Sequence, residues 1–281
     1  MFHNCFVNII YIVGMKKICS NTCTVAVIQL KKTTLYSIID EFTNNMDEIL
    51  TDHTILISFY DKIISNYKIE CEKGLLFVEK LIMYNVFFKF KLKSNSSNKL
   101  INQKILLYQW IQPTHLNLPN SNFKELIIHF RKMQYSNIPS VKIYYLMSGF
   151  QTMYNIMGKD IEYDKILGIT IYCLIKARVK DWWLHLQFTK LFRRSYYKDC
   201  CNNCNHGFNL NIICECLVSA NWHGEEEYYI TTFEAALDFI EKLEYYNLNI
   251  GLEEFERNIV SKAKDLDLNN PNASLSSFFR R

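Results

Sequence analysis

The stretch that decides the fold runs from Asn221 to Leu243 and reads NWHGEEEYYITTFEAALDFIEKL. Thr231 is followed three residues later by Glu234, which fits a capping box and so marks the first turn of a helix. Apolar residues then recur at helical spacing, namely Phe233, Ala236, Leu237, Ile240 and Leu243. We therefore expect a polar Gly224-Glu225 turn, with Tyr228 just before the helix N-terminus. A tyrosine held there can meet a ligand or cap the core.

A second informative stretch, DIEYDKILGITIYCLIKA at residues 160–177, joins an acidic segment to an almost wholly apolar run. The run leaves no polar face, so it is a buried helix or a buried strand, and its length favours the helix despite three β-branched residues at 169–171. Asp164 then lies at the start of this helix, where free backbone amides and the helix dipole keep a carboxylate ionised. On spacing alone, Asp164 is either a plain N-cap or a residue that acts on a partner.

Together the two stretches resemble the catalytic core of the vacuolar-protein-sorting VPS-nine domain family, whose members are guanine nucleotide exchange factors for Rab GTPases. Three further segments share this likeness. Lys104–Leu116 resembles the junction between the family's helical bundle and its catalytic domain, Lys132–Lys142 resembles its helix-loop-helix with an internal proline, and Tyr245–Glu256 resembles the end of its domain. The resemblance covers residues 31–257 and is strongest after residue 104.

The resemblance implies an all-α fold in which an N-terminal helical bundle packs on a layered α-helical VPS-nine domain. The bundle is expected at residues 31–110 and the catalytic domain at 111–257, with a cysteine-rich insert at 193–220. Residues 1–30 are expected to be a disordered leader and residues 258–281 a polar tail. Two bundle helices can be read directly, from an amphipathic stripe at Leu35–Leu50 and an apolar stretch at Leu75–Phe90.

The resemblance also implies an activity, the promotion of GDP release from a Rab-five-like small GTPase in endocytic and early endosomal trafficking. Asp164 matches the family's acidic finger and Tyr228 its tyrosine. The residues that match GTPase-binding or supporting positions are Gly168, Gly224, Glu225 and Thr231. A carboxylate offered to the phosphate-binding lysine of a GTPase can replace phosphate charge, so the nucleotide leaves without any bond being broken. The expected partner is a Rab-five subfamily GTPase, GDP-bound or nucleotide-free, met by a cytoplasmic protein that is recruited to early endosomes.

Departures from the family pattern leave a second function open. Gly168 stands where the family has a proline, four residues after the finger, and Lys165 stands where a second acid is common. A glycine within a helix costs about 1 kcal/mol relative to alanine, and a lysine beside Asp164 can compete for its charge. The family's Asn-Pro-Pro-like turn reads Arg178-Val-Lys-Asp181 here. The alternative is therefore an exchange-deficient scaffold of the same fold that still binds a GTPase.

Five of the ten cysteines crowd into residues 200–216, together with His206. Four of them, Cys201, Cys204, Cys214 and Cys216, supply the ligand number of a structural zinc site, although a Cys-x-Cys hook is less usual than Cys-x-x-Cys. The segment is either part of a zinc-stabilised interaction module or an insert with reduced thiols. No other cofactor is expected. The chain has no Gly-rich phosphate loop, so we expect it to act on a nucleotide-binding partner.

Composition agrees with a helical protein that has a sizeable core, since 49% of the 281 residues are hydrophobic and only four are proline. A net charge of +4 is mild, so nucleic acid is not an expected partner, and membrane association is expected to be peripheral at most. Residues 6–13 are apolar but too short to span a bilayer. One group of lysines forms either a solvated face or a surface for acidic membranes, namely Lys89, Lys91, Lys93, Lys99 and Lys104.

Overall fold

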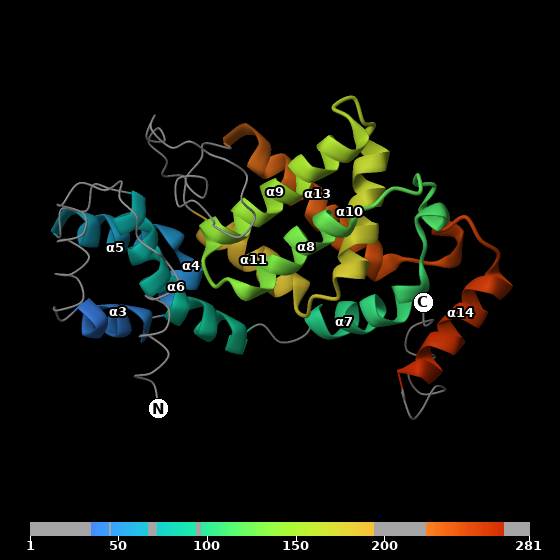
Figure 1. Cartoon of the computed structure of the whole chain (residues 1–281). Coiled ribbons are helices and arrows are strands. Elements are labelled where there is room, and N and C mark those ends of the chain that lie inside the picture. Colours follow the sequence, from blue (N-terminus) through green and yellow to red (C-terminus); the bar gives the residue numbers. More distant parts are fainter. Residues whose placement is uncertain (1–34, 45, 67–71, 94–96, 194–222, 267–281) are drawn as a thin grey trace.

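The protein is described by a computed structural model that covers residues 35–44, 46–66, 72–93, 97–193 and 223–266. These residues form helices joined by short turns, and no strand occurs among them (Figure 1). The first helices are α3 (Leu35–Asn44), α4 (Met46–Thr51), α5 (His53–Asn66), α6 (Glu72–Lys93) and α7 (Ser97–Leu107). They are followed by η1 (Tyr108–Trp110), η2 (Pro113–Leu116), α8 (Lys124–Lys132), η3 (Met133–Tyr135) and α9 (Pro139–Met157). The last are α10 (Tyr163–Ala177), α11 (Trp182–Phe192), α13 (His223–Lys242), η4 (Tyr245–Asn247) and α14 (Leu252–Asp265).

The all-α prediction is confirmed. None of the helices within these ranges combines the length and the apolar character that crossing a membrane requires.

The larger apolar core surrounds α10, which packs against α8, α13 and α7. Its side chains are buried all around the helix, including Ile166, Ile169, Ile171 and Leu174. The hydroxyl of Thr170 satisfies its hydrogen-bonding capacity within the helix by donating to the carbonyl of Ile166 at 2.8 Å. The apolar run of residues 163–177 is therefore a buried helix, as its length predicts.

A smaller core holds α3–α6 together and includes one face of α11. Leu184, Phe188 and Phe192 of α11 lie in this core, while Trp182 and Leu186 of the same helix lie in the larger one. The helix contributes to two cores because its apolar residues occupy more than one face. α11 is thus a shared wall between the N-terminal helices and the rest of the protein.

Two domain boundaries differ from the expected ones. The bundle was expected to reach residue 110, but Ile101, Ile105 and Leu107 of α7 pack in the larger core, so the division falls between α6 and α7. The polar tail was expected from residue 258, but α14 continues to Asp265 and buries Ile259 and Ala263. The residues expected to form the leader at 1–30 lie outside the described ranges.

Polar contacts fix the N-terminal helices to the larger core. The hydroxyl of Ser140, at the start of α9, donates to the carboxylate of Glu79 on α6 at 2.7 and 2.8 Å. Two residues further along α9, the buried Lys142 donates from Nζ to the carbonyl of Met133 at 2.6 Å and lies 2.8 Å from Nδ1 of His185. Pro139 begins α9, which confirms the helix-loop-helix with its internal proline, because proline suits the first position of a helix.

The turn between α10 and α11 lacks prolines and is held by hydrogen bonds. Arg178 and Asp181 both adopt left-handed backbone conformations, with φ of 54° and 60°. Asp181 donates its backbone N–H to Oδ1 of Asn102 at 2.8 Å, and its carboxylate accepts from Nδ2 of the same residue at 2.9 Å. These contacts tie the turn to α7.

The lysines of this cluster do not all belong to a solvated face, because two of them are engaged with backbone carbonyls. Lys104 is buried and donates to the carbonyl of Glu241 at 2.5 Å, and burial lowers its pKa. Lys89 donates to the carbonyl of Thr43 and to Oδ1 of Asn44, both at 2.6 Å, and so closes the end of α3. Lys91 and Lys99 are exposed. The apolar stripe at residues 35–50 also differs from expectation, because it belongs to two helices, α3 and α4, and not to one.

Candidate functional site

The turn between α9 and α10 positions Asp164. Gly158 ends α9 with φ of +91° and ψ of 163°, a conformation that suits only glycine, and its N–H donates to the carbonyl of Tyr154 at 2.8 Å. The chain then reverses and α10 begins (Figure 1). The carbonyl of Glu162 accepts from the N–H groups of Lys165 and Ile166, so Glu162 is the N-cap residue.

Asp164 is therefore the second residue of α10 and not its cap, which corrects the plain N-cap interpretation. Its side chain is exposed, and among the described residues no hydrogen bond or ion pair occupies it. The buried body of α10 holds the backbone of this residue in place, and the positive end of the helix dipole favours a negative charge there. The arrangement presents a free carboxylate from a fixed backbone.

The two departures near Asp164 have local structural explanations. Lys165 donates from Nζ to the carbonyl of Asn117 at 2.6 Å, so its charge is engaged with the turn after η2. Gly168 is buried, and a Cβ there would lie 3.1 Å from Cδ2 of Leu118. Gly168 thus allows Leu118 to pack closely on α10, and it does not line the surface around Asp164.

Helix α13 begins earlier than the sequence pattern predicts. It runs without a break from His223 to Lys242, so Gly224 and Glu225 lie in its first turn and Thr231 lies in its middle. The predicted capping box is wrong, because Glu234 pairs with Lys190 at 2.7 Å and Thr231 is exposed. Three consecutive glutamates follow Gly224, and acidic residues stabilise the start of a helix, so the helix extends in that direction.

Tyr228 projects from α13 with 40% of its surface exposed, and its ring makes an edge contact with Tyr163 at a centroid distance of 6.3 Å. Tyr163 is the neighbour of Asp164 in the chain, so this contact joins the starts of α10 and α13. Partial desolvation, together with Tyr154 and Tyr163, raises the pKa of Tyr228. Its hydroxyl therefore stays protonated at neutral pH and can donate a hydrogen bond. The contact of Tyr163 was not predicted, because nothing in its spacing distinguishes it from a surface tyrosine.

An aromatic cluster supports Tyr228 from below. Tyr229 is buried, stacks on Phe150 of α9 with a centroid distance of 4.2 Å, and lies 6.3 Å from the ring of Tyr154. Burial and a hydrogen bond with Tyr154 raise the pKa of Tyr229. The hydroxyl of Thr232 donates to the carbonyl of Tyr228 at 2.8 Å, which satisfies a threonine within the helix. α9, α10 and α13 are thus joined around the two tyrosines.

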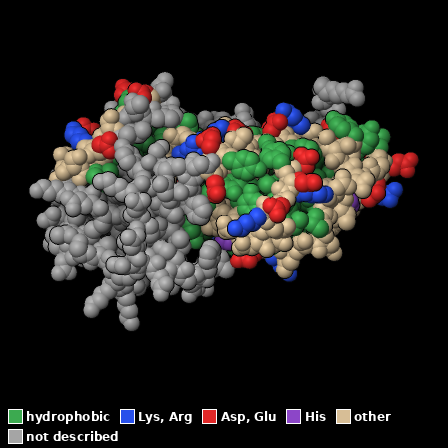
Figure 2. Space-filling model, turned by 90° about the horizontal axis from the view of Figure 1, so that it is seen from above, with side chains coloured by type: hydrophobic (Ala, Val, Ile, Leu, Met, Phe, Trp, Pro, Cys, Tyr) green, Lys and Arg blue, Asp and Glu red, His purple; other side chains and the backbone are tan. Residues whose placement is uncertain are grey.

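Three of the predicted site residues share one face of α13. Glu225, Tyr228 and Thr231 are each exposed and follow one another at a spacing of three residues, which places them side by side on a helix. Viewed from above, the described part of the protein shows a group of hydrophobic side chains with both acidic and basic side chains around it (Figure 2). The turn between α9 and α10 and the start of α13 belong to this upper side of the molecule (Figure 1).

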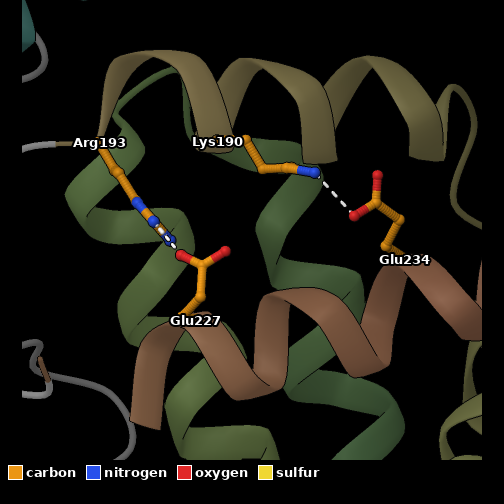
Figure 3. Close-up of polar contacts among 4 residues, drawn as sticks. All are labelled: Lys190, Arg193, Glu227 and Glu234. Carbon is orange, nitrogen blue, oxygen red and sulfur yellow. Dashed lines mark hydrogen bonds and ion pairs between the residues drawn. The ribbon is translucent and has the colours of Figure 1, made fainter. Parts of the chain in front are cut away.

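Two ion pairs hold α13 to α11 near the place where the insert leaves the helices (Figure 3). Lys190 contacts Glu234 at 2.7 Å, and Arg193 contacts Glu227. The hydrogen bond and the charge of Arg193 lower the pKa of Glu227. The chain leaves the described region after Arg193 and re-enters it at His223. These pairs therefore join the last turns of α11 to the first and middle turns of α13.

The predicted zinc ligands lie outside the described residues, as do Cys200 and His206. Within the described ranges, no group of three or more His, Cys, Asp or Glu side chains could hold a metal ion. His185 of α11 is buried, and its Nδ1 lies 2.8 Å from Nζ of Lys142 on α9.

A cavity at the opposite end of α10 is lined by Gln109, Arg131, Gln134, Tyr135, Lys176, Ala177 and Arg178. Its cations serve the end of the helix. Arg131 donates to the carbonyls of Ala177 and Lys176, and Lys176 donates to the carbonyl of Gln109. Such contacts satisfy carbonyl groups that a helix leaves free at its C-terminus. The cavity lies at the C-terminal end of α10, far along this helix from Asp164.

The sequence profile of the vacuolar sorting protein 9 (VPS9) domain matches residues 123–245. The chain contains a VPS9 domain. The match runs from the residue before α8 into η4, so both Asp164 and Tyr228 lie within it. A search among curated proteins finds no match to the chain.

The VPS9 domain is the catalytic domain of Rab guanine nucleotide exchange factors, so the family implied by the sequence is confirmed. The match leaves out α3–α7 and α14, although α7 and α14 contribute to the same apolar core as α8–α13. The VPS9 domain of this protein is therefore completed by helices on both sides of the matched segment.

Proposed function

We propose that this protein promotes GDP release from a Rab-five-like small GTPase in endocytic trafficking, as a cytoplasmic protein that is recruited to early endosomes. The VPS9 domain supports exchange activity on a Rab protein in general. A helical bundle followed by a VPS9 domain is also the order found in the catalytic core of Rabex-five, an exchange factor for Rab-five that the sequence resembles. Asp164 and Tyr228 are the residues that we expect to act on the GTPase.

The observation that carries the proposal is the exposed carboxylate of Asp164 at the start of a buried helix. A GTPase holds GDP through backbone amides, a lysine and Mg²⁺, all of which neutralise phosphate charge. A carboxylate inserted into this site can pair with the lysine and compete with the phosphates for it. Because the backbone of Asp164 is already fixed by α10, little conformational entropy is lost when it inserts.

Tyr228 supports the same proposal through its position and protonation. Its hydroxyl is a donor at neutral pH and lies on the exposed face that also carries Glu225 and Thr231. It can donate to a backbone carbonyl of a GTPase switch segment, while its ring covers apolar surface. Tyr163 maintains the distance between Tyr228 and the start of α10 through its edge contact. We therefore expect Tyr163 to position the two residues.

The test is the release of fluorescent GDP from a panel of Rab-five, Rab-twenty-one and Rab-twenty-two, with Ras, Rho and Arf proteins for comparison. We expect faster release from the Rab-five group alone. Asp164→Ala should slow release about a thousandfold, which corresponds to about 4 kcal/mol of activation free energy. Asp164→Asn should have the same effect, because the amide carries no charge for the lysine. Tyr228→Ala should slow GDP release less than Asp164→Ala does. Tyr163→Ala should also slow GDP release, whereas Tyr163→Phe should keep the wild-type rate.

Glu253→Ala is the matched control. Glu253 is also an exposed acid at the second position of a helix, since Gly251 caps α14 and Leu252 is its first residue. Both alanine variants lose a similar interaction with a helix dipole, about 0.3–1 kcal/mol of stability, so only a direct role in exchange separates them. If Asp164→Ala keeps the release rate within about threefold of the wild type, the assigned role is wrong.

The same experiment separates exchange from scaffolding. A folded protein that binds a Rab without accelerating GDP release would be the exchange-deficient scaffold. The contact of Lys165 with Asn117 supports exchange, because it directs the ammonium group to a backbone carbonyl and leaves the carboxylate of Asp164 without an ion pair to Lys165. A zinc-dependent interaction module would require bound metal in the purified protein, which elemental analysis measures.

A further inference from the structure

Helix α6 carries large apolar side chains on its outer face. Tyr84, Phe88 and Leu92 are exposed to 50%, 63% and 65%, and they follow one another at a spacing of four residues. Residues at this spacing lie above one another on a helix, so the three side chains form a stripe. The inner face of α6 is fully occupied, since Val86, Phe87 and Phe90 are buried in the smaller core. Single exposed apolar residues are common, but an aligned stripe indicates a surface that binds a protein or a membrane.

The part of the sequence that carries the stripe is basic. The segment 80–124 contains seven lysines and no Asp or Glu. Lys89 and Lys104 are engaged with backbone carbonyls, whereas Lys91 is exposed beside Leu92, and Lys99 is exposed beside Leu100 at the start of α7. Leu100 is itself 39% exposed. The C-terminal half of α6 and the first turn of α7 thus combine exposed apolar groups with positive charge and no acid.

We propose that this face, which we call the α6 face and define by Phe88, Lys91, Leu92, Lys99 and Leu100, docks on an anionic lipid surface. The apolar side chains would enter the boundary between head groups and acyl chains, and the lysine ammonium groups would remain among the phosphates and carboxylates of the lipids. This division of roles is that of interfacial amphipathic helices, whose binding depends both on buried apolar area and on attraction to anionic lipids.

The charge pattern favours a lipid surface over a second copy of the same face. Two long lysine side chains can extend along an apolar surface while their charged ends reach a polar layer. The α6 face offers two ammonium groups around an apolar centre and no carboxylate, so a second copy of the same face would repel it. An anionic membrane satisfies both the apolar and the charged groups at once. The inference concerns a surface outside the matched VPS9 segment, and it does not depend on the proposed exchange activity.

The position of the face is compatible with the candidate site. The C-terminal end of α6 and the start of α7 follow the lower edge of the molecule in Figure 1, whereas the turn before Asp164 is at the upper edge. We therefore expect docking through the α6 face to keep the turn between α9 and α10 away from the membrane. The protein could meet a membrane and a membrane-bound GTPase together.

The test uses the full chain and co-sedimentation with phosphatidylcholine vesicles, with and without phosphatidylserine. We expect binding only to vesicles that contain phosphatidylserine, weakened by salt. Phe88→Ser with Leu92→Ser should weaken it at least tenfold, and Lys91→Glu with Lys99→Glu should abolish the preference for phosphatidylserine. The matched control is Ile128→Ser with Leu252→Ser, which removes two apolar side chains of 47% and 46% exposure from other helices and should leave binding unchanged.

Unchanged thermal midpoints would show that each variant folds. The proposal is overturned if the wild type does not bind vesicles, or if Phe88→Ser with Leu92→Ser binds like the control. It is also overturned if that variant converts a dimer into a monomer in light scattering without changing vesicle binding, because the face would then join two copies of the chain.

Discussion

Lys142 offers a quantitative test of how the N-terminal helices are joined to the VPS9 domain. Its side chain is fully buried between α6, α9 and α11, and its Nζ contacts the carbonyl of Met133 and Nδ1 of His185. The ring of Phe87 on α6 lies 5.3 Å from Nζ. Burial lowers the pKa of Lys142 from its ordinary value of 10.5 to about 7. We predict that Lys142→Met removes a pH dependence of stability that the wild type shows.

The direction of this pH dependence follows from the number of protons that the folded and unfolded states bind. The unfolded chain keeps its proton on Lys142 up to pH 10.5, whereas the folded protein loses it at about pH 7. The unfolded state therefore binds more protons between these two values, so the free energy of unfolding rises with pH across this window. Below pH 7, Lys142 is protonated in both states, and its buried charge lowers the free energy of unfolding by the full amount. Between pH 7 and pH 9, the rise amounts to about 2 kcal/mol.

His185 does not interfere with this window. Burial, Lys142 and Lys91 hold the pKa of His185 well below its ordinary value of 6.5. Deprotonation of His185 in the unfolded state also raises the free energy of unfolding with pH. This rise is almost complete once the pH exceeds the pKa of the unfolded histidine, so it adds almost nothing between pH 7 and pH 9. Comparing wild type and variant at each pH also cancels the contributions of the shared groups that do not interact with Lys142.

The assay is urea unfolding at several pH values between 7 and 9 with a thiol reductant present. Lys142→Met keeps an unbranched side chain of similar length, so the packing changes little, although the carbonyl of Met133 loses its donor. The variant should gain stability relative to wild type at pH 7, and this difference should shrink by about 2 kcal/mol by pH 9. Lys124→Met, at an exposed position, should follow the wild-type profile. Parallel profiles for wild type and Lys142→Met would refute the reasoning.

Two further predictions concern the packing and the insert. Gly149→Ala should lower the free energy of unfolding by about 1–3 kcal/mol in urea titrations, because its Cβ would lie 2.5 Å from Cε1 of Phe130; an unchanged midpoint would mean that Phe130 can move aside. Replacing residues 194–222 by a short Gly/Ser linker should preserve helicity and GDP-release activity, because the ion pair of Arg193 with Glu227 holds the flanking helices together. Loss of cooperative unfolding together with loss of bound zinc would instead favour a structural metal site.

The elements that the sequence predicts well are those for which the length of a segment, or a residue with a strong positional preference, decides between the alternatives. The apolar run of α10 and the proline that begins α9 are of this kind. The capping box at Thr231 failed because a Thr-x-x-Glu spacing also occurs within helices, where the glutamate can pair with another element, as Glu234 does with Lys190. Local pattern alone does not reveal that distant partner.

The predicted end of the bundle and the predicted start of the polar tail were wrong for a related reason. Lys104 belongs to a lysine-rich segment, yet its burial depends on the carbonyl of Glu241, which is distant in the chain. The apolar spacing of Phe255, Ile259 and Ala263 could have revealed the full length of α14, because these residues recur every four positions. The contact of Tyr163 with Tyr228 had no such signal and required the three-dimensional arrangement of α10 and α13.

The shared wall formed by α11 has a consequence for how this protein can change over evolution. The segment that carries the VPS9 signature begins at residue 123, yet on its own it would expose Leu184, Phe188 and Phe192 to water. Burying three such side chains is worth several kcal/mol, comparable with the net stability of a typical domain. Transfer of the signature segment into another protein would therefore succeed only if the N-terminal helices, or a substitute for them, travelled with it. The segment that must be inherited together is therefore longer than the segment by which the family is recognised.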